Sequence, residues 1–301
     1  MSAVAIRTEG LGKRYGEHVA LRGLDLEVCR GEVFGFLGPN GAGKTTTIRL
    51  LLDLLRPTEG RAEVLGCNPR SDAVAVHRRT GYLPGELVLD PRMTGAQTLE
   101  WFANLRGGVR EPVRSALAER LDLDLSRPVG QLSKGNRQKV GLVQAFMHDP
   151  ELVVLDEPTS GLDPLVQRTV LQMVREVADD GRTVFLSSHL LDEVEQAADR
   201  AAIIRAGALV AIEDVAALRT RAVRRITLHF AHPLPGGVFD GVAGVRDADV
   251  HGRDVHVTVE GSVDGLFKAA AQHEVVDVSS GDTDLEAVFL GYYRQEGDGA
   301  A

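Results

Sequence analysis

The chain has 301 residues, of which 44% are hydrophobic and 26% are charged, so it has material for one large globular domain or about two. Its 43 acidic and 34 basic residues give a formal net charge of −9. This charge argues against a whole-chain nucleic-acid binder, because phosphate contacts need clustered Lys and Arg. The two cysteines, Cys29 and Cys67, cannot form a disulfide framework for a chain of this length and fit a reducing compartment.

Membrane-spanning and secretory segments are not evident in the sequence. No stretch reaches the ~18 uncharged apolar residues that a spanning helix needs. The N-terminus lacks the basic and apolar pattern of a signal peptide. We therefore expect a cytoplasmic protein, which would serve a membrane process only as a peripheral subunit.

Strands and helices alternate from the N-terminus to about residue 215, which predicts a largely parallel sheet wrapped by helices. Short apolar runs predict strands, and a helical pattern follows the run at 33–37. Between about residues 84 and 150 the strand pattern is lost, which predicts a helical insertion. The predicted strands are 24–28, 33–37, 152–155 and 183–186, and the predicted helices are 45–55, 94–106, 111–122 and 134–148.

The composition changes where four arginines cluster, between residues 219 and 225. Beyond this point we expect strands at 226–230 and 255–260 and helices at 266–273 and 285–294. We interpret the chain as a domain at 1–220 with a helical subdomain at about 86–150, a small α/β domain at 221–294 and a disordered tail at 295–301.

Residues 38–45 read Gly-Pro-Asn-Gly-Ala-Gly-Lys-Thr, between an apolar run and a predicted helix. The glycines let backbone N–H groups turn toward phosphates, and the helix presents its positive end to the same anion. Lys44 can reach the terminal phosphates, and the Thr45 hydroxyl is placed for Mg²⁺. The loop predicts nucleotide binding by Gly38, Pro39, Asn40, Gly41, Ala42, Gly43, Lys44, Thr45 and Thr46.

A second apolar run, 152–155, ends in Asp156 and Glu157. A buried strand that ends in Asp delivers the carboxylate to the carboxyl edge of the sheet, where ligands bind in open α/β folds. We expect Asp156 to hold Mg²⁺ through water and Glu157 to act as the general base. The alternative is that this segment only begins a turn and caps a helix.

Four motifs together resemble those of the ATP-binding-cassette (ABC) ATPases. They are GPNGAGKTT at 38–46, LSKGNRQKV at 132–140, LVVLDEPTSGLDP at 152–164 and LSSH at 186–189, and the resemblance covers about residues 4–215. It implies an ATPase that uses ATP and Mg²⁺. It also implies an α/β phosphate-loop NTPase cassette with a mostly parallel sheet, an antiparallel N-terminal β part and a helical insertion.

The resemblance assigns further residues. Ser133, Gly135 and Asn136 match the signature loop, which in this family contacts ATP held by a second subunit. Lys134 departs from the commonest form of that loop, LSGGQ. Asp163 lies in the segment 160–163, which resembles the loop that crosses the dimer interface in this family. Its competing role is that of a helix N-cap.

Two further residues match by position. His189 matches the switch histidine that contacts the terminal phosphate, and it completes an expected catalytic set with Glu157 and Lys44. A cap or surface role is the alternative for His189. Tyr15 resembles the aromatic residue that stacks on adenine, and a packing tyrosine is the alternative.

One departure concerns the metal. The family usually ends a strand with a glutamine near Mg²⁺, but here the segment 81–86 reads GYLPGE and aligns Gly85 with that position. We hypothesise that Glu86 supplies the missing oxygen, directly or through water. The alternative is that Glu86 is an exposed carboxylate at the start of a helix.

The resemblance also implies partners. Each chain would offer two half-sites, so a head-to-tail homodimer would complete two ATP sites. Transport would run through a separate integral-membrane permease, whose short cytoplasmic helix docks on the insertion at 86–150. The single cassette, the motif variants and the segment 284–290 look like those of drug-resistance ABC-2 exporter ATPases, which sit on the inner face of the membrane.

Rival interpretations are a soluble ABC ATPase that acts on DNA or ribosomes, and an ABC-2 ATPase of a non-drug export system. DNA-repair members split the cassette with a long coiled coil, and ribosome-acting members carry two cassettes. This sequence shows neither feature, and we expect no nucleic-acid partner.

Overall fold

The computed structural model describes residues 3–221 and 223–280, which fall into two compact units, Met1–Ile212 and Glu213–Ala301. The predicted helix at 285–294 and the predicted tail at 295–301 lie outside the described residues. None of the helices formed by the described residues is long and apolar enough to cross a membrane.

A six-stranded sheet in the order β5-β6-β7-β3-β8-β9 organises the first unit. The pairs from β5 to β8 are all parallel. Every residue of β3, β6 and β7 is buried, which explains why these strands are continuous apolar runs and confirms their prediction. The strands are β3 (Val33–Leu37), β5 (Thr80–Leu83), β6 (Leu152–Asp156), β7 (Thr183–Ser188), β8 (Arg200–Arg205) and β9 (Ala208–Asp214).

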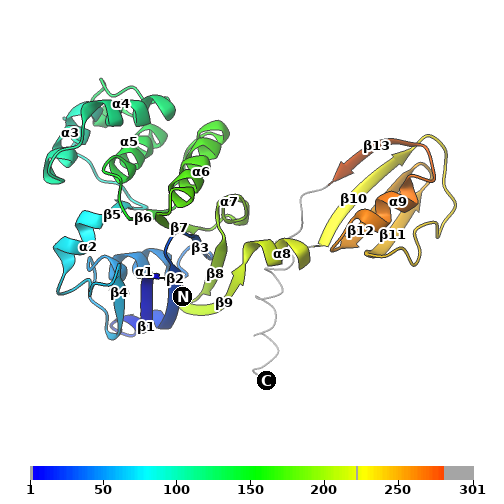
Figure 1. Ribbon diagram of the computed structural model, residues 1–301, viewed down its shortest axis with the longest axis horizontal. Helices are drawn as coiled ribbons and strands as arrows, with labels where there is room; N and C mark the ends of the chain where they lie inside the picture. Colours follow the sequence, from blue (N-terminus) through cyan, green and yellow to red (C-terminus); the bar gives the residue numbers. More distant parts are fainter. Residues whose placement is uncertain (1–2, 222, 281–301) are drawn as a thin grey trace. The chain divides into compact units, whose positions relative to one another are not determined.

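A second, antiparallel sheet in the order β2-β1-β4 lies on one side of the central strands (Figure 1). It consists of β1 (Val4–Tyr15), β2 (His18–Cys29) and β4 (Glu59–Val64). Helix α1 (Lys44–Leu51) contributes to the hydrophobic core between the sheets, where Leu24, Ile48 and Phe185 are fully buried. The helix is shorter than predicted because the chain turns at Asp53, which has a φ of 52°.

Residues 84–151, all of which are described, contain helices but no strand of these sheets, so the expected helices between β5 and β6 are confirmed. In Figure 1 they lie on the opposite side of the central strands from β1, β2 and β4. Thr94 and Gln97 form a capping box at the start of α3. The helices of this region are α3 (Gly95–Leu105), α4 (Glu111–Arg120), the 3-10 turn η1 (Val129–Gln131) and α5 (Lys134–Phe146).

Three further helices of this unit had no predicted bounds. They are α2 (Ala73–Arg79), α6 (Pro164–Asp179) and α7 (Leu191–Ala197). Helix α6 follows β6, and α7 follows β7. The loops at the carboxyl ends of β3, β6 and β7 therefore meet at one edge of the sheet.

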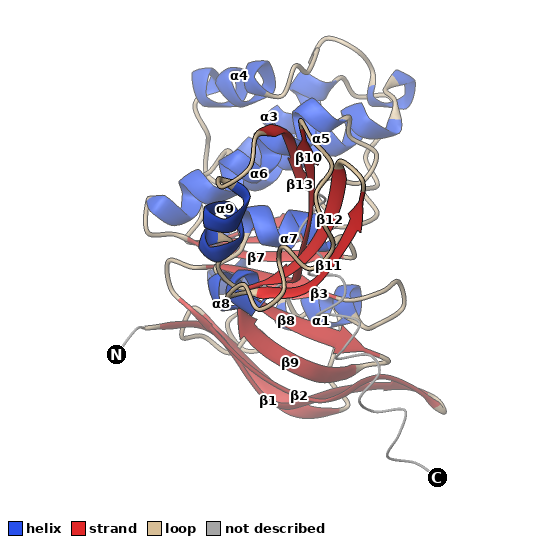
Figure 2. Cartoon of the chain, turned by 90° about the vertical axis from the view of Figure 1, so that its right-hand side faces the viewer, coloured by secondary structure: helices blue, strands red, loops and turns tan. Residues whose placement is uncertain are grey.

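The second unit has its own sheet, in the order β11-β12-β10-β13, with antiparallel pairs throughout. Figure 2 shows these four strands side by side, with α9 along one face. Phe230, Phe239 and Leu266 are fully buried in its separate hydrophobic core. The elements are α8 (Val215–Arg221), β10 (Val223–Phe230), β11 (Val245–His251), β12 (Asp254–Glu260), α9 (Asp264–Ala270) and β13 (Val275–Ser280).

Candidate nucleotide-binding site

The loop between β3 and α1 forms a wall of a pocket of about 340 Å³. Gly41 and Gly43 have φ values of 79° and 110°, which glycine adopts without strain. A Cβ on Gly43 would stand 2.8 Å from the carbonyl oxygen of Ala20, so the loop depends on that glycine for its shape. The lining residues are Tyr15, His18, Ala20, Asn40, Gly41, Gly43, Lys44, Thr45, Thr46 and Glu157.

The Lys44 ammonium group is held within this loop. Its side chain is only 5% exposed, and Nζ donates hydrogen bonds to the carbonyl oxygens of Gly38 at 2.6 Å and Pro39 at 3.3 Å. Nζ also lies 3.1 Å from Oε1 of Glu157. In this state the lysine is therefore paired with the carboxylate that we expect to be the general base.

Thr45 and Asp156, two of the predicted metal ligands, are in direct contact. The Thr45 hydroxyl donates to Asp156 Oδ2 at 2.7 Å, and the Ser187 hydroxyl donates to Oδ1 at 2.6 Å. Asp156 is fully buried. Carboxylate and hydroxyl oxygens are hard donors of the kind that Mg²⁺ prefers, so this pair fits that ion. No role was predicted for Ser187, although it lies within the LSSH motif at 186–189.

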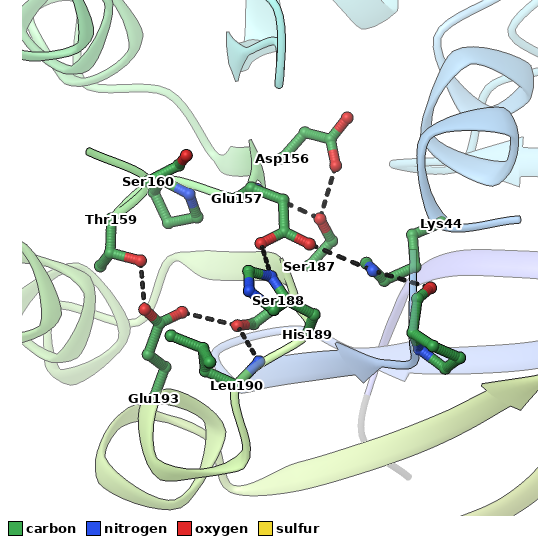
Figure 3. A network of polar contacts seen from close by, with 12 residues as sticks. Lys44, Asp156, Glu157, Thr159, Ser160, Ser187, Ser188, His189, Leu190 and Glu193 are labelled. Atoms are coloured by element: carbon green, nitrogen blue, oxygen red, sulfur yellow. Dashed lines mark hydrogen bonds and ion pairs between the residues drawn. The ribbon is translucent and has the colours of Figure 1, made fainter. Parts of the chain in front are cut away.

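Glu157 connects Lys44 to His189 (Figure 3). Its Oε2 lies 2.5 Å from Nδ1 of His189. Its φ of 52° lies in the left-handed region, a strained conformation of the kind that gathers at functional sites. The Glu157 N–H donates to the carbonyl oxygen and the hydroxyl of Ser187, both at 3.2 Å, which holds this backbone in place. The three residues predicted as catalytic thus form one chain of contacts.

Tyr15 lies at the end of β1 and lines the same pocket with 45% of its surface exposed. The Lys13 ammonium is 5.0 Å from the centre of the tyrosine ring. A base could stack on this exposed ring. His18 and Ala20 also line the pocket, and no motif in the sequence pointed to them.

The signature residues Ser133, Gly135 and Asn136 are outside this lining, at the start of α5. The Ser133 hydroxyl caps the helix by accepting a hydrogen bond from Asn136 N–H at 3.1 Å. A Cβ on Gly135 would stand 2.7 Å from the carbonyl oxygen of Gly161, so this helix start packs closely on the loop after β6. One copy of the chain therefore separates its phosphate loop from its signature loop.

Asp163 caps α6 in the structure. One oxygen of its carboxylate accepts hydrogen bonds from the N–H groups of Leu165 and Val166, both at 3.1 Å. These hydrogen bonds, chiefly the one from Val166, lower the pKa of Asp163 from its ordinary value. This geometry fits the capping role that the sequence left open beside an interface role.

The hypothesis that Glu86 binds the metal is not supported by its position. Gly85 lies beside Asp156, one of the predicted metal ligands, because a Cβ there would stand 3.0 Å from Asp156 Oδ2. Glu86 instead lines a different pocket, together with Tyr82 and Phe102, and is not among the residues that line the nucleotide pocket. The chain turns between positions 85 and 86, so the structure does not bring Glu86 together with Thr45 and Asp156.

A phosphate loop after β3 and a carboxylate pair at the end of the parallel strand β6 define a phosphate-loop nucleoside triphosphatase. The family described as ABC transporter matches residues 21–160. A solved ATP-binding subunit of an ABC transporter has the same fold, with a TM-score of 0.66 and 30% identity, over 71% of this chain and 92% of that chain.

Two relatives carry drug-resistance names. The chain is 45% identical over 216 residues to the daunorubicin resistance ATP-binding protein DrrA3 of Streptomyces coeruleorubidus, covering 70% of this chain and 68% of that protein. It is 36% identical over 301 residues to the daunorubicin/doxorubicin resistance ATP-binding protein DrrA of Streptomyces peucetius, covering 95% of this chain and 91% of that protein. The chain belongs to the ATP-binding proteins of ABC transporters, and it is an ATPase.

Proposed function

We propose that this chain is the ATP-hydrolysing subunit of an exporter and works on the inner face of the membrane with a separate ABC-2 type permease. The observation that carries the proposal is the similarity to the Streptomyces peucetius resistance protein, which covers 95% of this chain. That similarity extends beyond the first unit, which ends at Ile212. That relative is named for resistance to daunorubicin and doxorubicin, so a drug or antibiotic is the substrate class we favour.

ATP would enter the pocket beside the phosphate loop, with its base on Tyr15 and its phosphates against Lys44 and the loop amides. Thr45 and Asp156 would hold Mg²⁺, which would supply positive charge to neutralise the charge that develops on the phosphates. Arriving phosphates compete with Glu157 for the Lys44 ammonium. Nucleotide binding therefore releases the Glu157 carboxylate to accept a proton from the attacking water, while His189 contacts the terminal phosphate.

A second copy of the chain would complete each site. The signature residues do not line the pocket of their own chain. Two copies related by a two-fold axis would place Ser133, Gly135 and Asn136 of one against the ATP of the other. In this arrangement ATP holds the dimer together, and its hydrolysis lets the two copies separate.

The permease would dock on the apolar pocket of about 420 Å³ that Glu86 lines. Phe102 lines this pocket, and its neighbour Trp101 is 53% exposed. Val88, also in the lining, is 84% exposed. A short amphipathic helix of the permease would cover such a surface.

The test uses the full chain, alone and co-expressed with a candidate ABC-2 type permease from the same organism. Glu157→Gln should bind ATP with Mg²⁺, stop hydrolysis and give a stable dimer in size-exclusion chromatography. Its matched control, Glu157→Gln combined with Lys44→Ala, should stay monomeric. In cells, the original chain expressed together with the permease should raise tolerance to daunorubicin. Lys44→Ala in this chain should abolish that tolerance. A Glu157→Gln variant that stays monomeric with ATP, with or without the permease, would overturn the homodimer model. Unchanged ATP turnover in Lys44→Ala would overturn the assignment of the nucleotide-binding site.

A further inference from the structure

A buried carboxylate on α7 joins two loops of the site (Figure 3). Glu193 is only 6% exposed, which is rare for a glutamate without partners. Its Oε1 accepts a hydrogen bond from the Thr159 hydroxyl, and its Oε2 accepts one from the Ser188 hydroxyl at 2.6 Å. Thr159 and Ser188 are 3% and 0% exposed. Both links are therefore shielded from water, and each oxygen serves a different loop.

The first loop, 159–163, follows the catalytic carboxylate and contacts the start of α5. The Ser160 hydroxyl accepts a hydrogen bond from Lys134 Nζ at 3.3 Å. The carbonyl oxygen of Gly161 lies where a Cβ on Gly135 would be 2.7 Å away. A displacement of the start of α5, where the signature residues lie, would therefore move this loop and Thr159 with it.

The second loop carries His189. The Ser188 hydroxyl, besides donating to Glu193, accepts a hydrogen bond from Leu190 N–H at 2.9 Å. The residues on both sides of His189 are thus tied to one hydroxyl. Because the His189 ring lies 2.5 Å from Glu157, a small change in this backbone changes the distance between the two groups.

We propose that Glu193 is a positioning residue that couples the 159–163 loop to His189. The inference rests on the proposed function, in which the start of α5 faces the second copy of the chain and this loop packs directly behind it. When the approaching copy moves the loop, the carboxylate follows Thr159 and draws Ser188 with it. Leaving either hydrogen bond unmade in a buried site is unfavourable, which favours a concerted movement of the two segments. Dimer closure is thereby transmitted to the residue that contacts the terminal phosphate.

The test cuts one link and keeps the volume, because removing Glu193 itself could prevent folding. Thr159→Val lacks the hydroxyl, Thr159→Ser keeps it, and Asp192→Asn removes an exposed charge from the first turn of the same helix. We would measure amide hydrogen exchange of residues 187–195 and steady-state ATP turnover on the full chain. Thr159→Val should speed exchange there and lower kcat, each about tenfold, with KM for ATP within about twofold. The other two variants should match the original chain.

A double variant shows whether the two links act as one. Thr159→Val combined with Ser188→Ala should be no worse in kcat than the worse single variant, since either change already breaks the coupling. Losses that multiply would overturn the proposal, as would normal exchange and kcat in Thr159→Val. An equal loss in Thr159→Ser would mean that packing, not the hydrogen bond, is responsible. The exchange measurement needs neither turnover nor permease, so it decides the coupling even if the proposed function fails.

Discussion

His148 should make the first unit less stable in acid. The residue follows α5 and is half-buried, with Nε2 3.3 Å from the carbonyl oxygen of Thr80. Burial, and after it the charge of Arg106, lowers the pKa of His148 from 6.5 to about 4. Between these two values the unfolded chain binds a proton that the folded chain does not. Acidification through this window therefore favours unfolding.

The size of the effect follows from the pKa difference, 6.5 − 4 = 2.5. At about 1.4 kcal/mol per pKa unit the upper bound on the lost free energy of unfolding is about 3.5 kcal/mol. Because the ring is partly exposed, solvent screening reduces the expected loss to roughly 1.5–2 kcal/mol. The stability is complete above pH 6.5 and is lost as the pH falls toward 4.

The assay is denaturant unfolding of the full chain, followed by the fluorescence of Trp101, the single tryptophan. His148→Gln keeps a donor for Thr80 but does not titrate. From about pH 7 to about pH 4.5 the original chain should lose roughly 1.5–2 kcal/mol more than the variant. Equal losses in both proteins would refute the reasoning, and a smaller loss in the original chain would show that the sign is wrong.

Two further predictions concern neighbouring positions. Gly85→Ala places a Cβ 3.0 Å from Asp156 Oδ2, so the carboxylate must shift by a few tenths of an ångström. We expect a several-fold higher Mg²⁺ concentration for half-maximal turnover, and an unchanged Mg²⁺ titration would contradict this. Glu86→Ala should leave basal ATP turnover and its Mg²⁺ dependence within about twofold, because Glu86 lines the other pocket. A loss of Mg²⁺ dependence in that variant would restore Glu86 as a metal ligand.

The sequence predicts strands best where burial is complete. β3 has the predicted bounds, Val33–Leu37, because both of its faces are covered and nearly every position is apolar. β4 went unnoticed because most of Glu59–Val64 is exposed and polar. The start of helix α6 was anticipated by the N-cap role offered for Asp163, which Pro164 follows, but the extent of the helix was not predicted.

In the candidate site, too, some residues can be predicted from the sequence and others only from the fold. The phosphate loop is contiguous in sequence, so its residues can be identified without the fold. The direction in which Glu86 points depends on how the chain turns after β5, and no local pattern specifies that turn. The contacts of Glu193 with Thr159 and Ser188 need two loops from different strands. Only the packed sheet brings these groups together.

The pairing of Lys44 with Glu157 has a consequence for the idle protein. Both groups line the pocket that would take ATP, so a bound phosphate and the Glu157 carboxylate would compete for one ammonium. The freedom of this carboxylate to accept a proton would then follow nucleotide occupancy directly, through a single shared cation.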